Sequence, residues 1–257
     1  MNPAATQPAL SEIRVVISGA AGGVGRATIR KFLELGARIC ATDLDPAVAE
    51  LANGADGRVV AVVADVTKSR DIERIFARAE EAFGGVDCLV SNAAAIVTKS
   101  ILDTSEEEWD RVLDTNAKSC FFMMKRALPQ MISRRSGTVV VTASISSVVG
   151  LPTQAAYAAS KGALLQLVRQ TAVEYAPYGV RINAVGPGSI TRTKILDNYL
   201  SGLADPEEGA QAIRNAHPLG RWAEPEDVAE ALAFLAGPSS AFITGQILLV
   251  DGGYTAR

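Results

Sequence analysis

Short apolar runs alternate along the chain with longer stretches in which apolar residues recur at helical spacing. The short runs show little polar alternation, which is typical of strands buried on both faces of a parallel sheet. Strands are predicted at 13–18, 37–42, 59–63, 87–91, 138–142, 181–185 and 246–250. Helices are predicted at 23–35, 68–83, 105–132, 155–177 and 225–236. This alternation predicts right-handed βαβ units and therefore an α/β fold, a doubly wound parallel sheet of the Rossmann type with helices on both faces.

The pattern continues along the chain without an internal repeat or a low-complexity linker. The 257 residues fit one domain that spans 1–257. Residues 1–11 lack the basic start and the apolar run of a signal peptide, and they are predicted to form a frayed N-terminal arm. The segment 191–220 has the weakest pattern, and we interpret it as a substrate loop or lid.

Composition and charge narrow the classes of partner. Hydrophobic residues make up 48% and charged residues 21%, which is an ordinary globular balance. The net charge is −3 and no basic stripe is present, so nucleic acid is not an expected partner. No apolar run reaches the ~18 residues that a membrane helix needs, so we expect a soluble protein that does not contact a membrane.

The cysteines and the single histidine exclude several kinds of site. Cys40, Cys88 and Cys120 have no paired spacing, which favours free thiols in a reducing compartment, and we expect the cytoplasm. With His217 as the only histidine, a zinc-dependent alcohol dehydrogenase site is not expected, and no metal is predicted. A Ser-His-Asp hydrolase would depend on His217 alone, and no G-x-S-x-G elbow is present.

A glycine-rich turn, S-G-A-A-G-G-V-G at 18–25, follows the first predicted strand. Glycine permits positive φ and close approach of a ligand to the backbone. The start of the next helix offers unpaired N–H groups and a positive dipole end, which suit a pyrophosphate. Neither G-x-G-x-x-G/A nor the phosphate loop G-x-x-x-x-G-K-[ST] is matched, so a tight turn without a ligand is the alternative.

Asp43 ends the second predicted strand, about 20 residues after the glycines, where an acidic side chain can accept hydrogen bonds from an adenosine ribose. A carboxylate there would repel the additional 2′-phosphate of NADP. The next residue is Leu44 and not an arginine that would offset the repulsion. The sequence therefore favours NAD over NADP, with a simple strand-end turn as the alternative interpretation of Asp43.

The stretch Y-A-A-S-K at 157–161 places Tyr157 and Lys161 on one face of a predicted helix, one turn apart. A free tyrosine has a pKa of about 10, too high for an acid and base near neutral pH. Our hypothesis is that the nearby Lys161 ammonium lowers the pKa of Tyr157. The alternative is a packing aromatic residue beside a solvated lysine.

Together these features resemble the short-chain dehydrogenase/reductase family, over roughly 12–254. The family's T-G-x-x-x-G-x-G motif matches 18–25, with Ser18 in place of threonine, and its Y-x-x-x-K motif matches 157–161. Three further family positions fall on Ser144, on the helix asparagine Asn116, and on the Pro187–Gly188 pair after a predicted strand. Five motifs occur in the family's order, which makes the resemblance specific although each motif alone is weak.

The resemblance implies the roles of the site residues. Tyr157 would be the acid and base, Ser144 would donate a hydrogen bond to the substrate oxygen, and Lys161 would bind the nicotinamide ribose. Asn116 would hold a water that connects the lysine to solvent. The implied catalytic set is Asn116, Ser144, Tyr157 and Lys161. The implied NAD-binding set is Gly19, Gly23, Val24, Gly25, Asp43, Leu44, Asp65, Val66, Asn92, Tyr157, Lys161, Pro187, Gly188, Ile190, Thr191 and Thr193.

The sequence departs from the family pattern at two places. The family's N-N-A-G reads S-N-A-A at 91–94, so that Ala94 replaces a glycine. The family's carboxamide-binding threonine has two candidates, Thr191 and Thr193.

The substrate contacts are expected from Ser144, Ser146, Gln154 and Tyr157, and the polar pair Ser146 and Gln154 favours a sugar or small polyol.

Three functions are compatible with these residues. The first is an NAD-dependent oxidoreductase that interconverts a secondary alcohol with a ketone or lactone. The second is an NADPH-dependent reductase of a 3-oxoacyl thioester or similar ketone, and the third is a non-catalytic dinucleotide-binding regulatory protein.

The predicted helices at 105–132 and 155–177 have broad apolar faces. The family pairs these helices between subunits, so the resemblance implies a homotetramer or a homodimer.

Overall fold

A seven-stranded parallel sheet forms the centre of the protein, in the order β3-β2-β1-β4-β5-β6-β7. The computed structural model describes residues 10–201 and 205–256. The strands are β1 (Arg14–Ser18), β2 (Arg38–Asp43), β3 (Val59–Val63), β4 (Cys88–Ser91), β5 (Gly137–Thr142), β6 (Val180–Pro187) and β7 (Ile247–Val250). The predicted strands and the predicted α/β class are therefore confirmed. The strand order reverses between β1 and β4, and in open sheets of this kind the ligand crevice lies at the carboxyl ends of the strands at that point.

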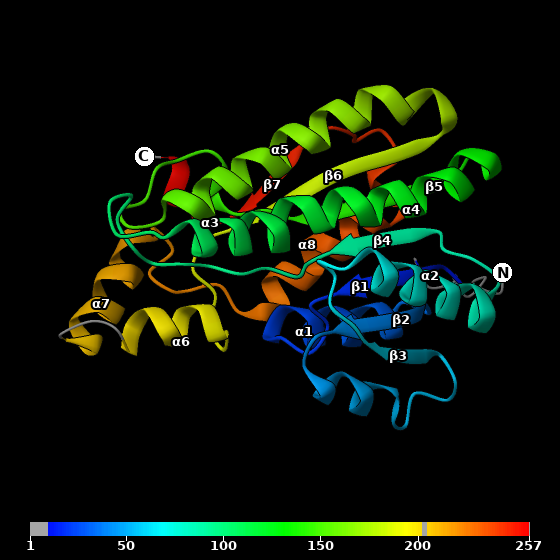
Figure 1. Cartoon of the computed structure of the whole chain (residues 1–257), viewed down its shortest axis with the longest axis horizontal. Helices are drawn as coiled ribbons and strands as arrows, with labels where there is room; N and C mark the ends of the chain where they lie inside the picture. Colours follow the sequence, from blue (N-terminus) through cyan, green and yellow to red (C-terminus); the bar gives the residue numbers. More distant parts are fainter. Residues whose placement is uncertain (1–9, 202–204, 257) are drawn as a thin grey trace, which may run out of the picture.

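Helices cover both faces of the sheet (Figure 1). The α-helices are α1 (Gly23–Glu34), α2 (Ser69–Phe83), α3 (Glu106–Leu113), α4 (Ser119–Arg134), α5 (Ala155–Tyr175), α6 (Lys194–Ser201), α7 (Pro206–Ala216) and α8 (Pro225–Ala236). One hydrophobic core lies beneath α1 and α8, and a second lies beneath α2, α4 and α5. Of the helices in the described part of the chain, none is long and apolar enough to cross a membrane.

Strand β1 shows why the strands are almost wholly apolar. Val15 and Ile17 belong to the core beneath α1 and α8, whereas Val16, between them, belongs to the core on the other face. Successive side chains of a strand point to opposite faces, so a sheet covered on both sides needs apolar residues at every position.

The region predicted as one helix at 105–132 contains a change of helical pitch. Helix α3 begins with a capping box, in which Ser105 and Glu108 bond each other's backbone N–H groups. A π-helical turn, Asp114–Lys118, then separates α3 from α4. Such turns are rare and frequently lie at functional sites, and this one contains Asn116.

The segment 191–220, interpreted above as a loop or lid without clear elements, contains α6 and α7. The N-terminus of α7 is well specified, because the Asp205 carboxylate accepts hydrogen bonds from the N–H groups of Glu207 and Glu208, and Pro206 opens the helix. Both helices lie beyond the carboxyl ends of the strands (Figure 1). Their short length and polar outer faces concealed them in the sequence.

The prediction that residues 1–11 form a frayed arm is wrong at the C-terminal end of this segment. Residues 1–9 lie outside the described part of the chain. Leu10, however, is completely buried in the core beside α1, and its N–H donates to the carbonyl of Leu35. An apolar side chain that fills the core is anchored by burial and not frayed.

The three cysteines are buried as free thiols, as predicted. Burial raises the pKa of Cys40 and of Cys88 to about 12 and that of Cys120 to about 11. They are therefore protonated near neutral pH and pack as small apolar side chains.

Candidate active site

A cleft of about 1860 Å³ lies along the carboxyl ends of the strands. It is lined by nearly all of the residues that the sequence predicted for the cofactor, the substrate and catalysis. The exceptions are Thr191 and Asn116, which do not line it. Segments far apart in the sequence thus meet at one edge of the sheet, as the strand reversal at β1 and β4 predicts.

The glycine-rich turn is tightly packed at the start of α1. Gly19 has φ +65°, and a Cβ there would lie 2.9 Å from the backbone of Ala93. The N-cap residue of α1, Gly22, offers no side chain to the first N–H groups of the helix. A helix start without a capping side chain, facing a cleft, has the backbone donors and the dipole that a pyrophosphate needs.

Asp43 connects the end of β2 to the glycine-rich turn. Its Oδ2 accepts a hydrogen bond from the N–H of Ala21 at 2.9 Å, and its Oδ1 accepts one from the N–H of Asp45 at 2.9 Å. Each carboxylate oxygen can accept a second hydrogen bond, and Asp43 lines the cleft. Asp43 therefore does act as a turn residue, and its carboxylate keeps acceptor sites for the predicted contact with a ribose.

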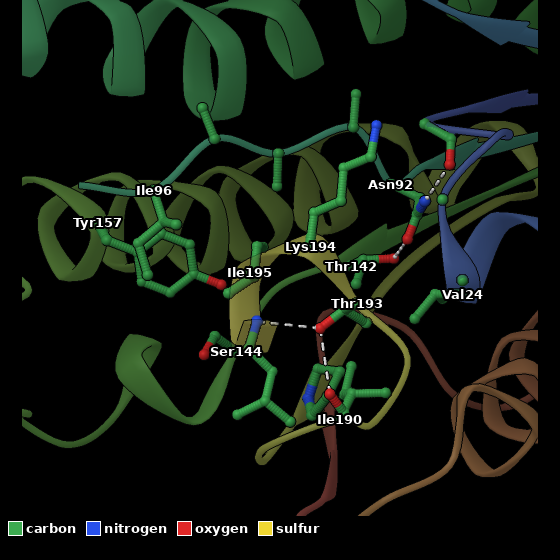
Figure 2. Close-up of a pocket in the computed structure, with 18 of the residues that line it drawn as sticks. Val24, Asn92, Ile96, Thr142, Ser144, Tyr157, Ile190, Thr193, Lys194 and Ile195 are labelled. Carbon is green, nitrogen blue, oxygen red and sulfur yellow. Dashed lines mark hydrogen bonds between the residues drawn. The ribbon is translucent and has the colours of Figure 1, made fainter. Parts of the chain in front are cut away.

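Asn92 holds three strand ends together at the floor of the cleft (Figure 2). Its Nδ2 donates to the carbonyls of Ser18 and Gly19, and its Oδ1 accepts from the hydroxyl of Thr142 at 3.1 Å. The Ser18 hydroxyl in turn accepts from the N–H groups of Asn92 and Ala93. This explains why serine can replace the family's threonine at position 18, since the hydroxyl makes the contacts.

Tyr157, Lys161 and Ser144 form a buried group. Tyr157 and Lys161 lie on α5 and are 9% and 1% exposed, and Ser144 follows β5 and is 8% exposed. The Lys161 ammonium nitrogen lies 5.5 Å from the centre of the Tyr157 ring and donates to the carbonyl of Thr142 at 2.8 Å. The structure therefore excludes the solvated lysine that was the alternative interpretation.

Burial dominates the pKa values of this group. It raises the pKa of Tyr157 to about 12, and a hydrogen bond with Ser144 opposes the increase. It lowers the pKa of Lys161 to about 8. In the protein alone, Lys161 does not lower the pKa of Tyr157 below its ordinary value, because the cost of a buried phenolate is the larger effect.

Asn116 lies behind the cleft and is 1% exposed. Its Oδ1 accepts from the N–H of Ala95 at 2.7 Å, and its Nδ2 donates to the carbonyl of Ala95 and to the hydroxyl of Ser160. The Ser160 hydroxyl donates to the carbonyl of Tyr157. Both amide protons of Asn116 are thus used to join the loop after β4 to α5, a role that the sequence did not predict.

The two candidate threonines have different surroundings. Thr193 lines the cleft, where its hydroxyl donates to the carbonyl of Ile190 and accepts from the N–H of Leu196 (Figure 2). The hydroxyl of Thr191 instead donates to the carboxylate of Glu224 at 2.5 Å.

Apolar side chains lie beside Tyr157 in the cleft, where Figure 2 draws Ile96 and Ile195. The two polar residues predicted for the substrate bond each other, since the Ser146 hydroxyl donates to Oε1 of Gln154 at 3.1 Å. Further apolar residues of the cleft lining are Leu151, Ile213 and Ala216.

Comparison with known proteins identifies the family. The family model described as enoyl-(acyl carrier protein) reductase matches residues 19–255. The chain is 39% identical to 2-(S)-hydroxypropyl-CoM dehydrogenase 3 of Xanthobacter autotrophicus over 246 residues, 94% of this chain and 96% of the relative. The chain belongs to the short-chain dehydrogenase/reductase family.

Two further similarities span nearly the whole chain. The 3-oxoacyl-[acyl-carrier-protein] reductase FabG of Thermotoga maritima is 35% identical and covers 93% of this chain and 96% of its own length. The ligand-free aldohexose dehydrogenase of Thermoplasma acidophilum superposes with a TM-score of 0.89 at 29% identity, over 97% of this chain and 96% of that chain. The protein is therefore an oxidoreductase of a family that acts on CH–OH groups of small molecules with a nicotinamide dinucleotide.

Proposed function

We propose that the protein is an NAD-dependent oxidoreductase that interconverts a secondary alcohol with a ketone or lactone, described below in the direction of oxidation. The observation that carries the proposal is the buried group of Ser144, Tyr157 and Lys161 in the same cleft as an uncapped helix start and the Asp43 carboxylate. The glycine-rich turn and the start of α1 would hold the pyrophosphate, and Asp43 would bind the adenosine ribose. When bound, NAD supplies the acceptor for the hydride.

The side chains of this chain would manage the proton. The phenolate of Tyr157 takes the proton from the substrate hydroxyl as the hydride leaves the carbon. Ser144 donates a hydrogen bond to the same oxygen and holds it near Tyr157. Because burial raises the pKa of Tyr157 to about 12, positive charge must stabilise the phenolate during the reaction. The Lys161 ammonium, which lies over the Tyr157 ring, would provide this charge, and a bound oxidised nicotinamide would add to it.

Asp43 and Leu44 support NAD over NADP, because both line the cleft and neither offers a cation to a 2′-phosphate. The rival is an NADPH-dependent 3-oxoacyl thioester reductase, which the similarity to the FabG protein favours. Arg26 also lines the cleft, and its Nε donates to the carbonyl of Ala21. Its guanidinium is the group that would serve a 2′-phosphate if the rival were right.

We assign the nicotinamide carboxamide to Thr193, because Thr193 lines the cleft and Thr191 does not. The remaining residues implied by the family, among them Asp65, Val66, Pro187 and Gly188, line the same cleft and fit the cofactor role.

For the substrate, the apolar side chains of Ile96 and Ile195 beside Tyr157 support a secondary alcohol with an apolar carbon chain. The sugar or polyol expected from Ser146 and Gln154 has the weaker support, since the Ser146 hydroxyl donates its proton to Gln154. It stays a second candidate because of the likeness to the aldohexose dehydrogenase.

We further infer that the protein is a homotetramer or homodimer that pairs α4 and α5. Phe121 on α4 and Val173 on α5 are 48% and 78% exposed, which is unusual for large apolar side chains on helices that also contribute to the core. Sedimentation of the purified protein tests the assembly.

The function is tested by binding and turnover. Affinities for NADH and NADPH are measured first, and NADH formation is then followed over a panel of aliphatic secondary alcohols, sugars and polyols. Tight NADH binding with turnover of the apolar alcohols is the expected result. Preference for NADPH would favour the reductase, turnover of sugars alone would favour the second candidate, and cofactor binding without turnover would favour a regulatory protein.

A further inference from the structure

His217, the only histidine of the sequence, is 2% exposed and lies at the C-terminal end of α7. It lines the cleft, but neither the family motifs nor the proposed mechanism gives it a role. A polar ring that is buried this deeply needs hydrogen-bond partners, and the identity of these partners shows what the ring holds in place.

Two hydrogen bonds fix the ring in one tautomer. Nδ1 lies 2.7 Å from the carbonyl oxygen of Ile213, which can only accept, so Nδ1 carries the proton. Nε2 lies 3.3 Å from the backbone nitrogen of Ser189, which can only donate, so Nε2 is the acceptor. The imidazole therefore connects α7 to the loop that follows β6.

The loop after β6 is packed closely under this ring. A Cβ on Gly188 would lie 2.6 Å from Nε2, so only glycine allows the ring to approach. The ring also contacts Tyr254 of the C-terminal tail, with 5.3 Å between the ring centres. Gly188 and Ser189 both line the cleft, a few residues before Thr193, to which the proposed function assigns the nicotinamide carboxamide.

Helix α7 also lines the cleft, through Ile213 and Ala216. His217 follows directly after them and accepts from the N–H of Ser189. The same ring thus joins the part of α7 that lines the cleft to the backbone of the loop after β6.

We propose that His217 is a positioning residue that fixes the loop of Gly188 and Ser189 against the nicotinamide, through the acceptor nitrogen Nε2. The proposal rests on the proposed function, because it needs a nicotinamide in this cleft. It assigns to His217 no contact with the reacting atoms. It differs from a purely structural role in predicting a defect confined to one end of the cofactor.

The test uses two substitutions that each keep one of the two hydrogen bonds. His217→Gln places an oxygen near the position of Nε2 and can still accept from Ser189. His217→Asn places its amide near the position of Nδ1 and can still donate to Ile213, but it does not reach Ser189. Affinities for NADH and for ADP-ribose, which lacks the nicotinamide, are measured for each full-length variant.

We expect His217→Asn to weaken NADH binding about tenfold, the cost of about one lost hydrogen bond, and to leave ADP-ribose binding within about twofold of wild type. His217→Gln should restore most of the NADH affinity. If His217→Asn fails to fold, Gly188→Ala provides a second test, because its methyl group pushes against Nε2. It should also weaken NADH binding and leave ADP-ribose binding nearly unchanged. Ser240→Ala, which removes a buried hydroxyl near the start of β6, controls for general loss of stability.

Other outcomes would overturn the proposal. Equal losses for NADH and ADP-ribose, or equal behaviour of the Asn and Gln variants, would indicate a structural role alone. If wild type prefers NADPH, the series is run with NADPH and 2′-phospho-ADP-ribose, so an error in the cofactor assignment does not affect the result. If wild type binds neither dinucleotide, the proposed function fails first, and this inference fails with it.

Discussion

The ammonium of Lys161 lies 5.5 Å from the centre of the Tyr157 ring, and both side chains are buried against the end of the sheet. The protein carries an unfavourable charge at this position, since burial lowers the pKa of Lys161 to about 8 and raises that of Tyr157 to about 12. A site that must hold positive charge in a dry environment reduces the stability of the fold that contains it.

Lys161→Met should therefore stabilise the protein while it removes activity. The ordinary pKa of lysine is 10.5 and the folded value is about 8, so below about pH 8 the fold bears the full cost of the buried charge. Allowing for the lost hydrogen bond to Thr142, we expect a gain of roughly 2 kcal/mol at pH 7. This corresponds to an increase of about 4 to 8 °C in Tm, measured by thermal denaturation of the apoprotein.

The pH dependence of that gain has a definite sign. Between about pH 8 and pH 10 the folded lysine is neutral while the unfolded lysine stays charged, so the penalty falls as pH rises, and the difference in Tm should shrink. The thermal denaturation series stops near pH 10, below the raised pKa of Tyr157, so that ionisation of Tyr157 does not add to the trend. Lys125→Met, on the exposed face of α4, should show no such trend. A Lys161 variant no more stable than wild type at pH 7 would refute this account of the site.

Tyr157→Phe should abolish turnover and leave cofactor binding intact. The substitution removes the one hydroxyl that exchanges the substrate proton, and we expect kcat to fall at least about 1000-fold. The affinity for NADH should change less than about threefold, because the ring stays in place. Tyr175→Phe, at the far end of the same helix and half exposed, is the matched control. Turnover that survives in Tyr157→Phe would assign the proton transfer to another residue.

The sequence predicted those parts of the structure that depend on local patterns. The strands were found because burial on both faces makes them continuous apolar runs, as Val15, Val16 and Ile17 show. The pairing of Tyr157 and Lys161 was found because a helix repeats its face every turn. The assembly of distant motifs into one cleft came from the resemblance to the family.

The features that were missed depend on contacts between distant residues. The sequence shows that Asn116 lies in a helix, but not that its amide reaches Ala95 and Ser160. It shows Lys161 beside Tyr157, but not that burial outweighs their attraction. Ser146 and Gln154 suggested a hydroxylated substrate because they are polar. The sequence does not show that the two side chains bond each other, since they meet only in the folded protein.

Asp43→Asn should reduce the discrimination against NADPH. A carboxylate and a phosphate about 4 Å apart repel by roughly 4 kcal/mol at an effective dielectric constant near 20. Part of this is screened in an open cleft, so we expect the ratio of NADH to NADPH affinity to fall about 100-fold. Asp45→Asn keeps its cap on Ala47 and should change the ratio less than about threefold. Equal effects of the two substitutions would remove the specific role of Asp43.

Thr193→Val and Thr191→Val should separate the two candidate threonines. We expect Thr193→Val to lower kcat/KM about tenfold with NAD, and Thr191→Val to stay within about twofold. The comparison is repeated with the 3-acetylpyridine analogue of NAD, which has a methyl ketone in place of the carboxamide. The defect of Thr193→Val should shrink with this analogue. A defect that is equal for both cofactors would instead reflect the bonds of Thr193 to Ile190 and Leu196.

Asn116→Ala should cost stability as well as activity, because it leaves the N–H and the carbonyl of Ala95 without their partner. A buried group that loses its hydrogen bond costs about 1 to 3 kcal/mol. Because Ala95 is half-buried and lines the cleft, where water can replace part of the bonding, we expect a loss of about 1 to 3 kcal/mol in the free energy of unfolding. Asn116→Asp keeps the acceptor for the N–H of Ala95 but loses both donors, and it should still be clearly less stable than wild type. Urea denaturation measures the losses. An Asn116→Ala protein that is as stable as wild type, yet inactive, would contradict the positioning role and give Asn116 a direct part in the proton path.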